Sequence, residues 1–164
     1  MKNLLIVVMC IFIACATAYK RDGFTGGYSE LQLDENVFSV SFKGNGFTNS
    51  ERAEDFALLR CAELAIENGY NFFIIIDSKS YVSRSTYTTP TTSKTKGTAS
   101  WSGYNRIDYN ETTKTKGGET YIISKPSQSN TIVCFVKKPE GFSYTAAYVY
   151  NGLAQKYNIQ KTHF

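Results

Sequence analysis

The chain is poor in the residues from which most active sites are built. It has a single histidine, His163, which is the next-to-last residue. A chain end frays too readily to hold a general base, so a Ser-His-Asp or Cys-His hydrolase is not expected. One histidine with two widely separated cysteines also supplies too few ligands for a zinc site. We therefore expect no catalytic residue, no metal site and no cofactor.

Strong net charge and membrane-spanning apolar runs are missing too. The sequence holds 18 Lys and Arg against 14 Asp and Glu, which is too mild an excess to predict a nucleic-acid partner. The longest apolar run covers residues 4–14. A transmembrane helix needs about 20 apolar residues, so this run is too short to be one.

The first eighteen residues instead have the layout of an export signal: Lys2, then the apolar run, then small residues. Ala14 directly before Cys15 favours a bacterial lipoprotein, in which residues 1–14 are removed and Cys15 is acylated, for example with palmitate. Residue 16 is not the Asp associated with inner-membrane retention, which predicts an outer-membrane location. The alternative is cleavage after Ala18, which would release a soluble periplasmic protein.

The remaining residues have the size and composition of one globular domain rich in β-structure, with 12 Tyr and 11 Phe. Only Cys61 and Cys134 remain as thiols once the signal is removed. An oxidising compartment makes them a candidate disulfide. Both also fit buried apolar positions, one in a helical pattern and one in a strand, so a free buried pair is the alternative.

After the signal, residues 15–27 are expected to be the lipidated Cys and a tether, because residues 19–27 are polar and Gly-rich. A hairpin follows, formed by strands at 28–33 and 37–43. Thr48 and Glu51 form a capping box for a helix over 50–68, which Gly69 ends. The apolar run 72–77 predicts a central strand, and strand–helix–strand order implies a parallel pair.

The second half predicts a strand at 81–88 and a hairpin of strands 119–124 and 131–136 around residues 126–130. Ser143 is expected to cap a final helix. The sum is an α+β fold of order ββαβββα over residues 28–164, a mixed, mostly antiparallel sheet with two helices packed on it. The acidic residues of the first helix, Glu63 among them, alternate with Arg52 and Arg60 and predict a solvated face.

Residues 89–118 form a Thr-, Ser- and Gly-rich insertion that lacks apolar periodicity and cannot build a core. We expect a mobile loop or an extended hairpin arm. Between residues 78 and 118 there are seven basic residues and only two acidic ones. The simpler interpretation is a solvated insertion, and the functional alternative is contact with an anionic glycan, lipopolysaccharide or another envelope protein. The residues that would make this contact are Lys94, Lys96, Trp101, Arg106, Lys114 and Lys116.

The chain resembles a family of small proteobacterial lipoproteins of uncharacterised function. The resemblance rests on Cys15-Ala16-Thr17 and on residues 23–29, 40–46, 51–60 and 68–70. It covers most of the chain but is loose over the Thr-rich insertion, and Phe12 stands where the family usually has Leu. It implies a lipid anchor at Cys15 and carries over no activity.

The sequence therefore favours a lipid-anchored protein of the bacterial outer membrane, facing the periplasm or the cell surface, with a binding or structural role and no enzymatic activity. A soluble periplasmic ligand-binding protein is the first alternative, and it would need an apolar pocket with a few convergent polar groups. An envelope hydrolase is the second, and it would need an acidic pair or an activated serine in a cleft.

Overall fold

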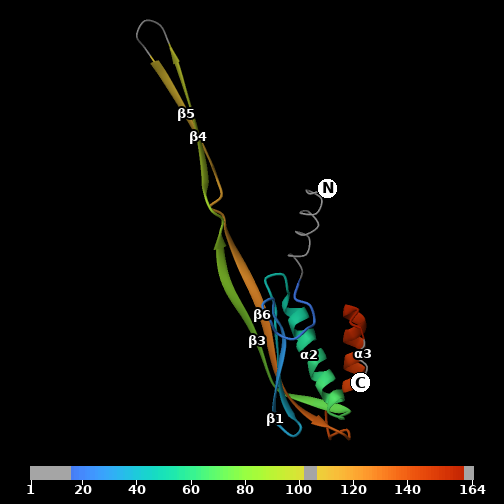
Figure 1. Ribbon diagram of the computed structural model, residues 1–164. Helices are drawn as coiled ribbons and strands as arrows, with labels where there is room; N and C mark the ends of the chain where they lie inside the picture. Colours follow the sequence, from blue (N-terminus) through green and yellow to red (C-terminus); the bar gives the residue numbers. More distant parts are fainter. Residues whose placement is uncertain (1–15, 102–106, 161–164) are drawn as a thin grey trace. The chain divides into compact units, whose positions relative to one another are not determined.

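The computed structural model describes residues 16–101 and 107–160. Figure 1 shows the order of the elements. They are β1 (Gly27–Asp34), β2 (Val37–Lys43), α2 (Ser50–Glu67), β3 (Phe72–Thr88), β4 (Thr92–Trp101), β5 (Ile107–Lys116), β6 (Thr120–Phe135), β7 (Tyr144–Thr145) and α3 (Ala146–Tyr157). The predicted α+β class, with two helices, mostly antiparallel strands and a hairpin arm, is confirmed.

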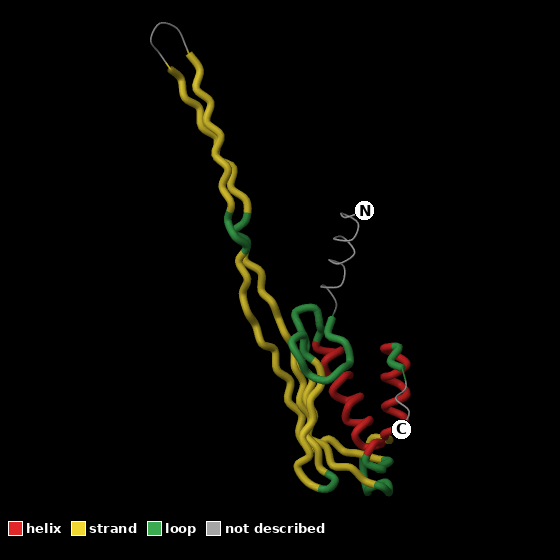
Figure 2. Tube along the Cα trace, in the orientation of Figure 1, coloured by secondary structure: helices red, strands yellow, loops and turns green. Residues whose placement is uncertain are grey.

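The chain divides into two compact units. We call the described part of residues 16–84 and 124–160 the body, and the described part of residues 85–123 the arm. The body holds a five-stranded sheet in the order β1-β2-β6-β3-β7, and the arm holds a two-stranded sheet of β4 and β5. Figure 2 distinguishes the helices, strands and loops of each unit.

The core of the body lies between one face of the sheet and the two helices. Phe38, Val40 and Phe42 alternate along β2 and are buried, whereas the residues between them are only half-buried. The buried face of α2 matches the predicted stripe. Its residues Ala53, Phe56, Ala57, Cys61, Leu64 and Ala65 are all buried. The small residues let α2 lie close to the sheet. Phe56 joins the layers, with its ring centroid 5.1 Å from that of Phe42 and 4.7 Å from that of Tyr157 in α3.

Two strand predictions in the body are wrong. β2 and β3 are not neighbours, because β6 lies between them. The predicted hairpin around residues 126–130 is instead the continuous strand β6, which pairs with β2 from Ser127 to Val133. Pro126 is tolerated inside it because its carbonyl accepts the Gly44 N–H just beyond the end of β2, so the missing N–H falls where that ladder stops.

The helix starts also differ from the predicted caps. Asn49, not Thr48, caps α2: its side chain accepts the Arg52 N–H at 2.8 Å. The predicted helix end is confirmed, with Asn68 as the C-cap and Gly69 at a φ of +77°. Helix α3 begins at Ala146 without a side-chain cap, and the Ser143 hydroxyl has no hydrogen-bond partner among the described residues.

Candidate functional site

The segment that follows Cys15 is packed against the body and is not the free tether that its glycines suggested. Thr17 is buried, its N–H donates to the Thr48 hydroxyl at 3.0 Å, and its own hydroxyl donates to the Thr25 carbonyl at 3.0 Å. The Asn45 N–H donates to the Thr17 hydroxyl at 2.9 Å. Thr48 is thus occupied by this segment, which explains why it does not cap α2.

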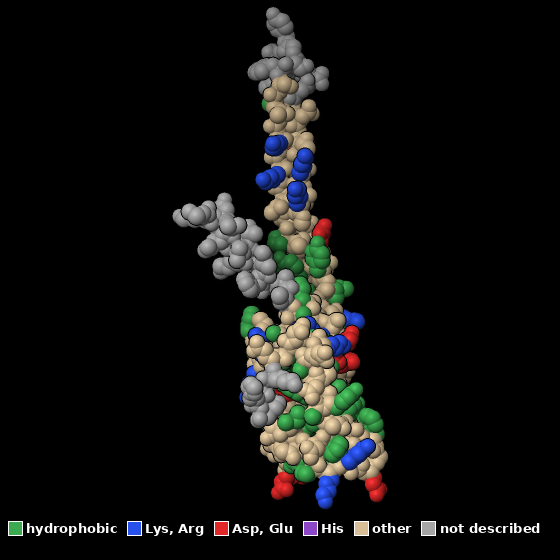
Figure 3. All heavy atoms as spheres, turned by 90° about the vertical axis from the view of Figure 1, so that its right-hand side faces the viewer, with side chains coloured by type: hydrophobic (Ala, Val, Ile, Leu, Met, Phe, Trp, Pro, Cys, Tyr) green, Lys and Arg blue, Asp and Glu red, His purple; other side chains and the backbone are tan. Residues whose placement is uncertain are grey.

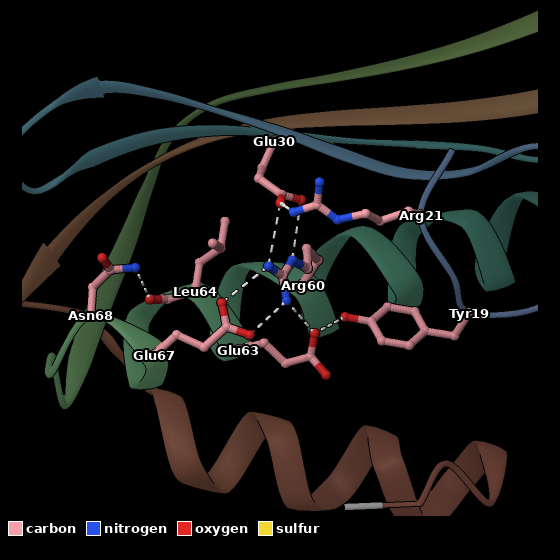
Figure 4. Close-up of polar contacts among 8 residues, drawn as sticks. All are labelled: Tyr19, Arg21, Glu30, Arg60, Glu63, Leu64, Glu67 and Asn68. Carbon is pink, nitrogen blue, oxygen red and sulfur yellow. Dashed lines mark hydrogen bonds and ion pairs between the residues drawn. The ribbon is translucent and has the colours of Figure 1, made fainter. Parts of the chain in front are cut away.

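A buried ionic network holds the next residues (Figure 4). Arg60 of α2 donates from Nη1 to Glu63 Oε2 at 2.8 Å and to Glu67 Oε1 at 2.9 Å. Its Nε reaches Glu30 Oε2 of β1 at 3.3 Å, and its guanidinium lies over the Tyr28 ring, 4.8 Å from the centroid. The Tyr19 hydroxyl donates to Glu63 from the other side.

The electrostatics of this network favour the ion pair and the neutral phenol. Burial and the neighbouring Glu63 carboxylate raise the pKa of Tyr19. Burial alone would lower the pKa of Arg60, but its hydrogen bonds to Glu67 and Glu63 raise it overall. The prediction of a solvated face is therefore wrong at Arg60 and Glu63, which are both buried. Amphipathic spacing alone gives no signal for this, because the residues that cover Arg60 come from β1 and the segment before it.

The network and the Thr17 contacts form a clamp for residues 17–30, in which Arg60 is paired with three carboxylates. Two further carboxylates of α2 are paired as well: Lys156 of α3 lies 2.6 Å from Glu51 Oε1 and 2.7 Å from Asp55 Oδ2. Among the described residues, no group of three or more His, Cys, Asp or Glu is placed to hold a metal ion. Cys15 and His163 lie outside the described residues.

The arm carries the second candidate site, which its strand register creates. β4 and β5 pair antiparallel, with Lys94 opposite Lys114, Lys96 opposite Thr112, and Thr92 opposite Lys116. Since side chains alternate along a strand, these residues share one face of the ribbon. They line a groove of about 320 Å³, and Figure 3 shows the basic side chains gathered along this part of the chain. We call Lys94, Lys96, Lys114 and Lys116 the lysine face.

The lysine face has no internal counter-charge. None of its four lysines forms an ion pair with any residue that the structure describes. Lys94 and Lys114 lie directly across the ladder from each other, an arrangement that destabilises a sheet because like charges repel. The arm pays this electrostatic penalty without burying any described side chain. An anionic ligand laid along the groove would remove it.

The opposite face of the ribbon is uncharged for most of its length. The Thr95 and Thr113 hydroxyls are 3.0 Å apart, and those of Ser93 and Thr115 are 3.3 Å apart. The Tyr109 side chain lies over Gly97. A Cβ atom at residue 97 would be only 2.2 Å from the Tyr109 hydroxyl. Glu111, opposite Gly97, adds one acidic residue to this face, so the lysines of the ribbon lie on one side and an acidic residue on the other.

The structure brings together four of the six residues that the sequence suggested for anionic contact. Trp101 belongs to the same ribbon, where its backbone pairs with Ile107, and Arg106 lies outside the described residues. Composition alone identified the basic segment. Only the register, which places Lys94 opposite Lys114, shows that the charges converge.

The candidate disulfide is absent from the structure. Cys61 and Cys134 are both free and buried in the same apolar cluster. Burial raises the pKa of each thiol to about 12, so both stay protonated and unreactive at neutral pH. The Asn130 amide nitrogen lies 4.0 Å from the Cys61 sulfur.

The sheet of the body also carries a groove of about 300 Å³. Its walls include Ser41, Ser127 and Ser129 together with Lys43, Lys79 and Lys125. In the described ranges, 16–101 and 107–160, no helix has both the length and the apolar character needed to cross a bilayer.

Comparison with family models, with curated proteins and with solved structures finds no match. The resemblance to small proteobacterial lipoproteins therefore stays a prediction from the sequence.

Proposed function

We propose that the protein is a lipid-anchored component of the bacterial outer membrane that binds phosphate- or carboxylate-bearing glycans of the envelope, lipopolysaccharide first among them, through its arm. The role is binding rather than catalysis, and the lipid is carried by Cys15. The proposal has two parts, an anchor and a ligand surface, and each is supported by a different region of the chain.

The packing of Thr17 supports maturation at Cys15 over cleavage after Ala18. Thr17 contributes three hydrogen bonds to the loop at Asn45 and Thr48 and one to Thr25. A chain that began at Tyr19 would lack all of them and would leave the Thr48 hydroxyl without its buried partner. A chain that begins at Cys15 keeps every one.

The unneutralised pairing of Lys94 with Lys114 is the observation that carries the ligand assignment. Four ammonium groups share one face of a narrow ribbon, and none has a carboxylate partner among the described residues. Successive lysines on one strand are two residues apart, about 6.6–6.8 Å, so a polymer with regularly spaced anionic groups can meet several at once. A lysine ammonium binds phosphate as a point charge, without the planar fork of arginine, which suits a ligand of irregular geometry.

The anchor is tested by the mass of the N-terminal peptide of protein purified from cell membranes, with Cys15→Ser as the comparison. We expect a peptide that begins at an acylated Cys15, and loss of both the acyl mass and membrane association in the variant. An unmodified peptide that begins at Tyr19 would contradict the anchor.

The ligand surface is tested by co-sedimentation with purified lipopolysaccharide. We compare Lys94→Gln/Lys114→Gln with a matched pair, Lys137→Gln/Lys138→Gln, which removes the same charge from exposed lysines of the body. The arm variant should bind about tenfold or more weakly and with a shallower dependence on salt, while the body variant keeps most of its affinity. Equal weakening in both pairs would show a response to net charge alone and refute a specific lysine face.

A further inference from the structure

Two exposed phenylalanines flank Thr17 at the N-terminal end of α2. Phe24 is fully exposed, and 63% of Phe47 is exposed. Phe24 directly precedes Thr25, whose carbonyl accepts the Thr17 hydroxyl at 3.0 Å. Phe47 directly precedes Thr48, whose hydroxyl accepts the Thr17 N–H at 3.0 Å. The two loops that carry them thus meet at Thr17, and Figure 2 shows both at this end of α2.

The position of Thr17 limits how far a lipid on Cys15 can be from these rings. Thr17 is fixed by its hydrogen bonds, and Cys15 is two residues before it. Two residues of fully extended chain span at most about 7 Å. A lipidated Cys15 would therefore hold the Phe24 and Phe47 loops at the surface of the bilayer, with no room for a flexible spacer.

We propose that Phe24 and Phe47 insert into the lipid interface and fix the orientation of the body on the membrane. The proposal rests on the lipid anchor of the proposed function and adds a contact surface to it. Aromatic rings gather at membrane–water interfaces, and an exposed apolar side chain gains free energy when it leaves water. The acyl chains hold the protein at one point, and two rings on separate loops stop it from rotating about that point.

The charges of the same segment suit a phospholipid surface. Lys20, Arg21 and Lys43 lie on or beside the Phe24 loop, and all three are exposed. Asp22 pairs with Lys43 at 2.8 Å, and Glu30 pairs with Arg21 at 2.6 Å, which leaves the Lys20 ammonium for anionic headgroups. Basic residues beside aromatic ones are the composition of interfacial segments.

Phe142 serves as the control, because it is an exposed phenylalanine that lies far from Thr17. Its side chain is 76% exposed, more than that of Phe47, and its ring packs edge-on against Tyr144 at 4.9 Å. Tyr144 pairs with Phe73, just beyond the C-terminal end of α2. The helix has 18 residues and is therefore about 27 Å long, so Phe142 is far from the Thr17 end.

The test places a tryptophan at each of the three positions in the full chain. A Trp101→Phe background removes the single native tryptophan, and Phe24→Trp, Phe47→Trp or Phe142→Trp is then added. Each protein is purified from membranes and its N-terminal mass is measured. It is then placed in phosphatidylethanolamine–phosphatidylglycerol vesicles whose acyl chains carry bromine, a short-range quencher of tryptophan fluorescence.

We expect bromine to quench most of the fluorescence at positions 24 and 47, together with a blue shift of the emission, and to leave position 142 unquenched. Equal signals at all three positions in lipidated protein would overturn the orientation while the anchor stands. A peptide mass without acyl chains would instead overturn the anchor, and the orientation with it. The mass and the quenching thus separate the two failures.

Discussion

The body and the arm belong to the same chain but are stabilised by different interactions. In the body, Phe42, Phe56 and Phe73 are completely buried or nearly so, and even an arginine and a glutamate are enclosed and paired. In the arm, no described residue is buried, and two lysines face each other across the ladder. The body is held by burial, whereas the arm is held by backbone hydrogen bonds and hydroxyl pairs.

The two regions therefore differ in how their side chains affect folding stability. A two-stranded ribbon is marginally stable in water, and like charges placed opposite each other weaken it further. The lysine face weakens the arm, and the Arg60 network and Phe56 strengthen the body. Experiments that change one region and leave the other intact can therefore test the division directly.

The largest effect is expected from removing a ring in the core. Phe56→Ala should lower the free energy of unfolding of the body by about 3–5 kcal/mol, because it leaves a cavity where Phe42, Tyr19 and Tyr157 meet. Tyr109→Ala removes an aromatic ring from the arm and should leave the body transition unchanged. Urea denaturation followed by circular dichroism measures both. Similar losses in the two variants would mean that the arm contributes to the cooperative core.

Two threonine variants, one in the body and one in the arm, test the same difference with smaller expected effects on stability. Thr17→Val should destabilise the body by about 1–3 kcal/mol, because it removes a largely buried hydroxyl that donates to the Thr25 carbonyl and accepts from the Asn45 N–H and the Thr48 hydroxyl. Thr95→Val breaks an exposed hydroxyl pair with Thr113 and should stay within about 0.5 kcal/mol of the parent protein. Thermal melts of the two variants decide this, and a silent Thr17→Val would show that the clamp does not hold residues 17–30.

Alkaline pH should weaken the body through its two thiols. Their pKa is about 12 in the folded protein against 9.0 for an ordinary thiol, so between pH 8 and pH 9.5 they ionise only after unfolding. The folded state then binds more protons, and stability falls as pH rises, by about 0.8 kcal/mol for each thiol. Urea titrations under reducing conditions measure this slope. A Cys61→Ala/Cys134→Ala variant should have a shallower slope, and an unchanged slope would refute the assignment.

The smallest effect is a gain in the arm. Lys94→Thr removes the repulsion with Lys114 and should stabilise the ribbon by about 0.2–1 kcal/mol. Amide hydrogen exchange in β4 and β5 should slow in this variant, while exchange in the body is unaffected. Lys138→Thr, a similar change in the body, serves as the control. Faster exchange in the arm of Lys94→Thr would mean that the lysine stems stabilise the ribbon by packing.

The sequence predicts the elements that repeat a local pattern. The α2 stripe from Ala53 to Ala65 and the alternation of β2 have periods of 3.6 and 2, and both match the structure closely. Gly69 ends α2 as expected, because a left-handed residue is needed there. The class of the fold follows from these elements alone.

The sequence fails where a residue's partner is distant in the chain. Thr48 has the pattern of a helix cap, but Thr17, 31 residues earlier, takes its hydroxyl. Pro126 has the pattern of a turn, but the end of β2 makes a proline harmless in the middle of β6. Arg60 and Glu63 look solvated until β1 and Tyr19 cover them. Of the candidate sites, composition located the basic segment, and the convergence of its lysines depended on the register.

The alternation of faces in the ribbon has an evolutionary consequence. Because the two lysines of each strand are two residues apart, a duplication or loss of two residues in each of β4 and β5 keeps the lysines on the same side. Each such step changes the length of the ribbon by about 6.8 Å and adds or removes one cross-strand pair on that side. Small, paired insertions can therefore change the length of the ribbon and its number of charges together. Body sequences can be inherited unchanged while this happens, since no buried residue is involved.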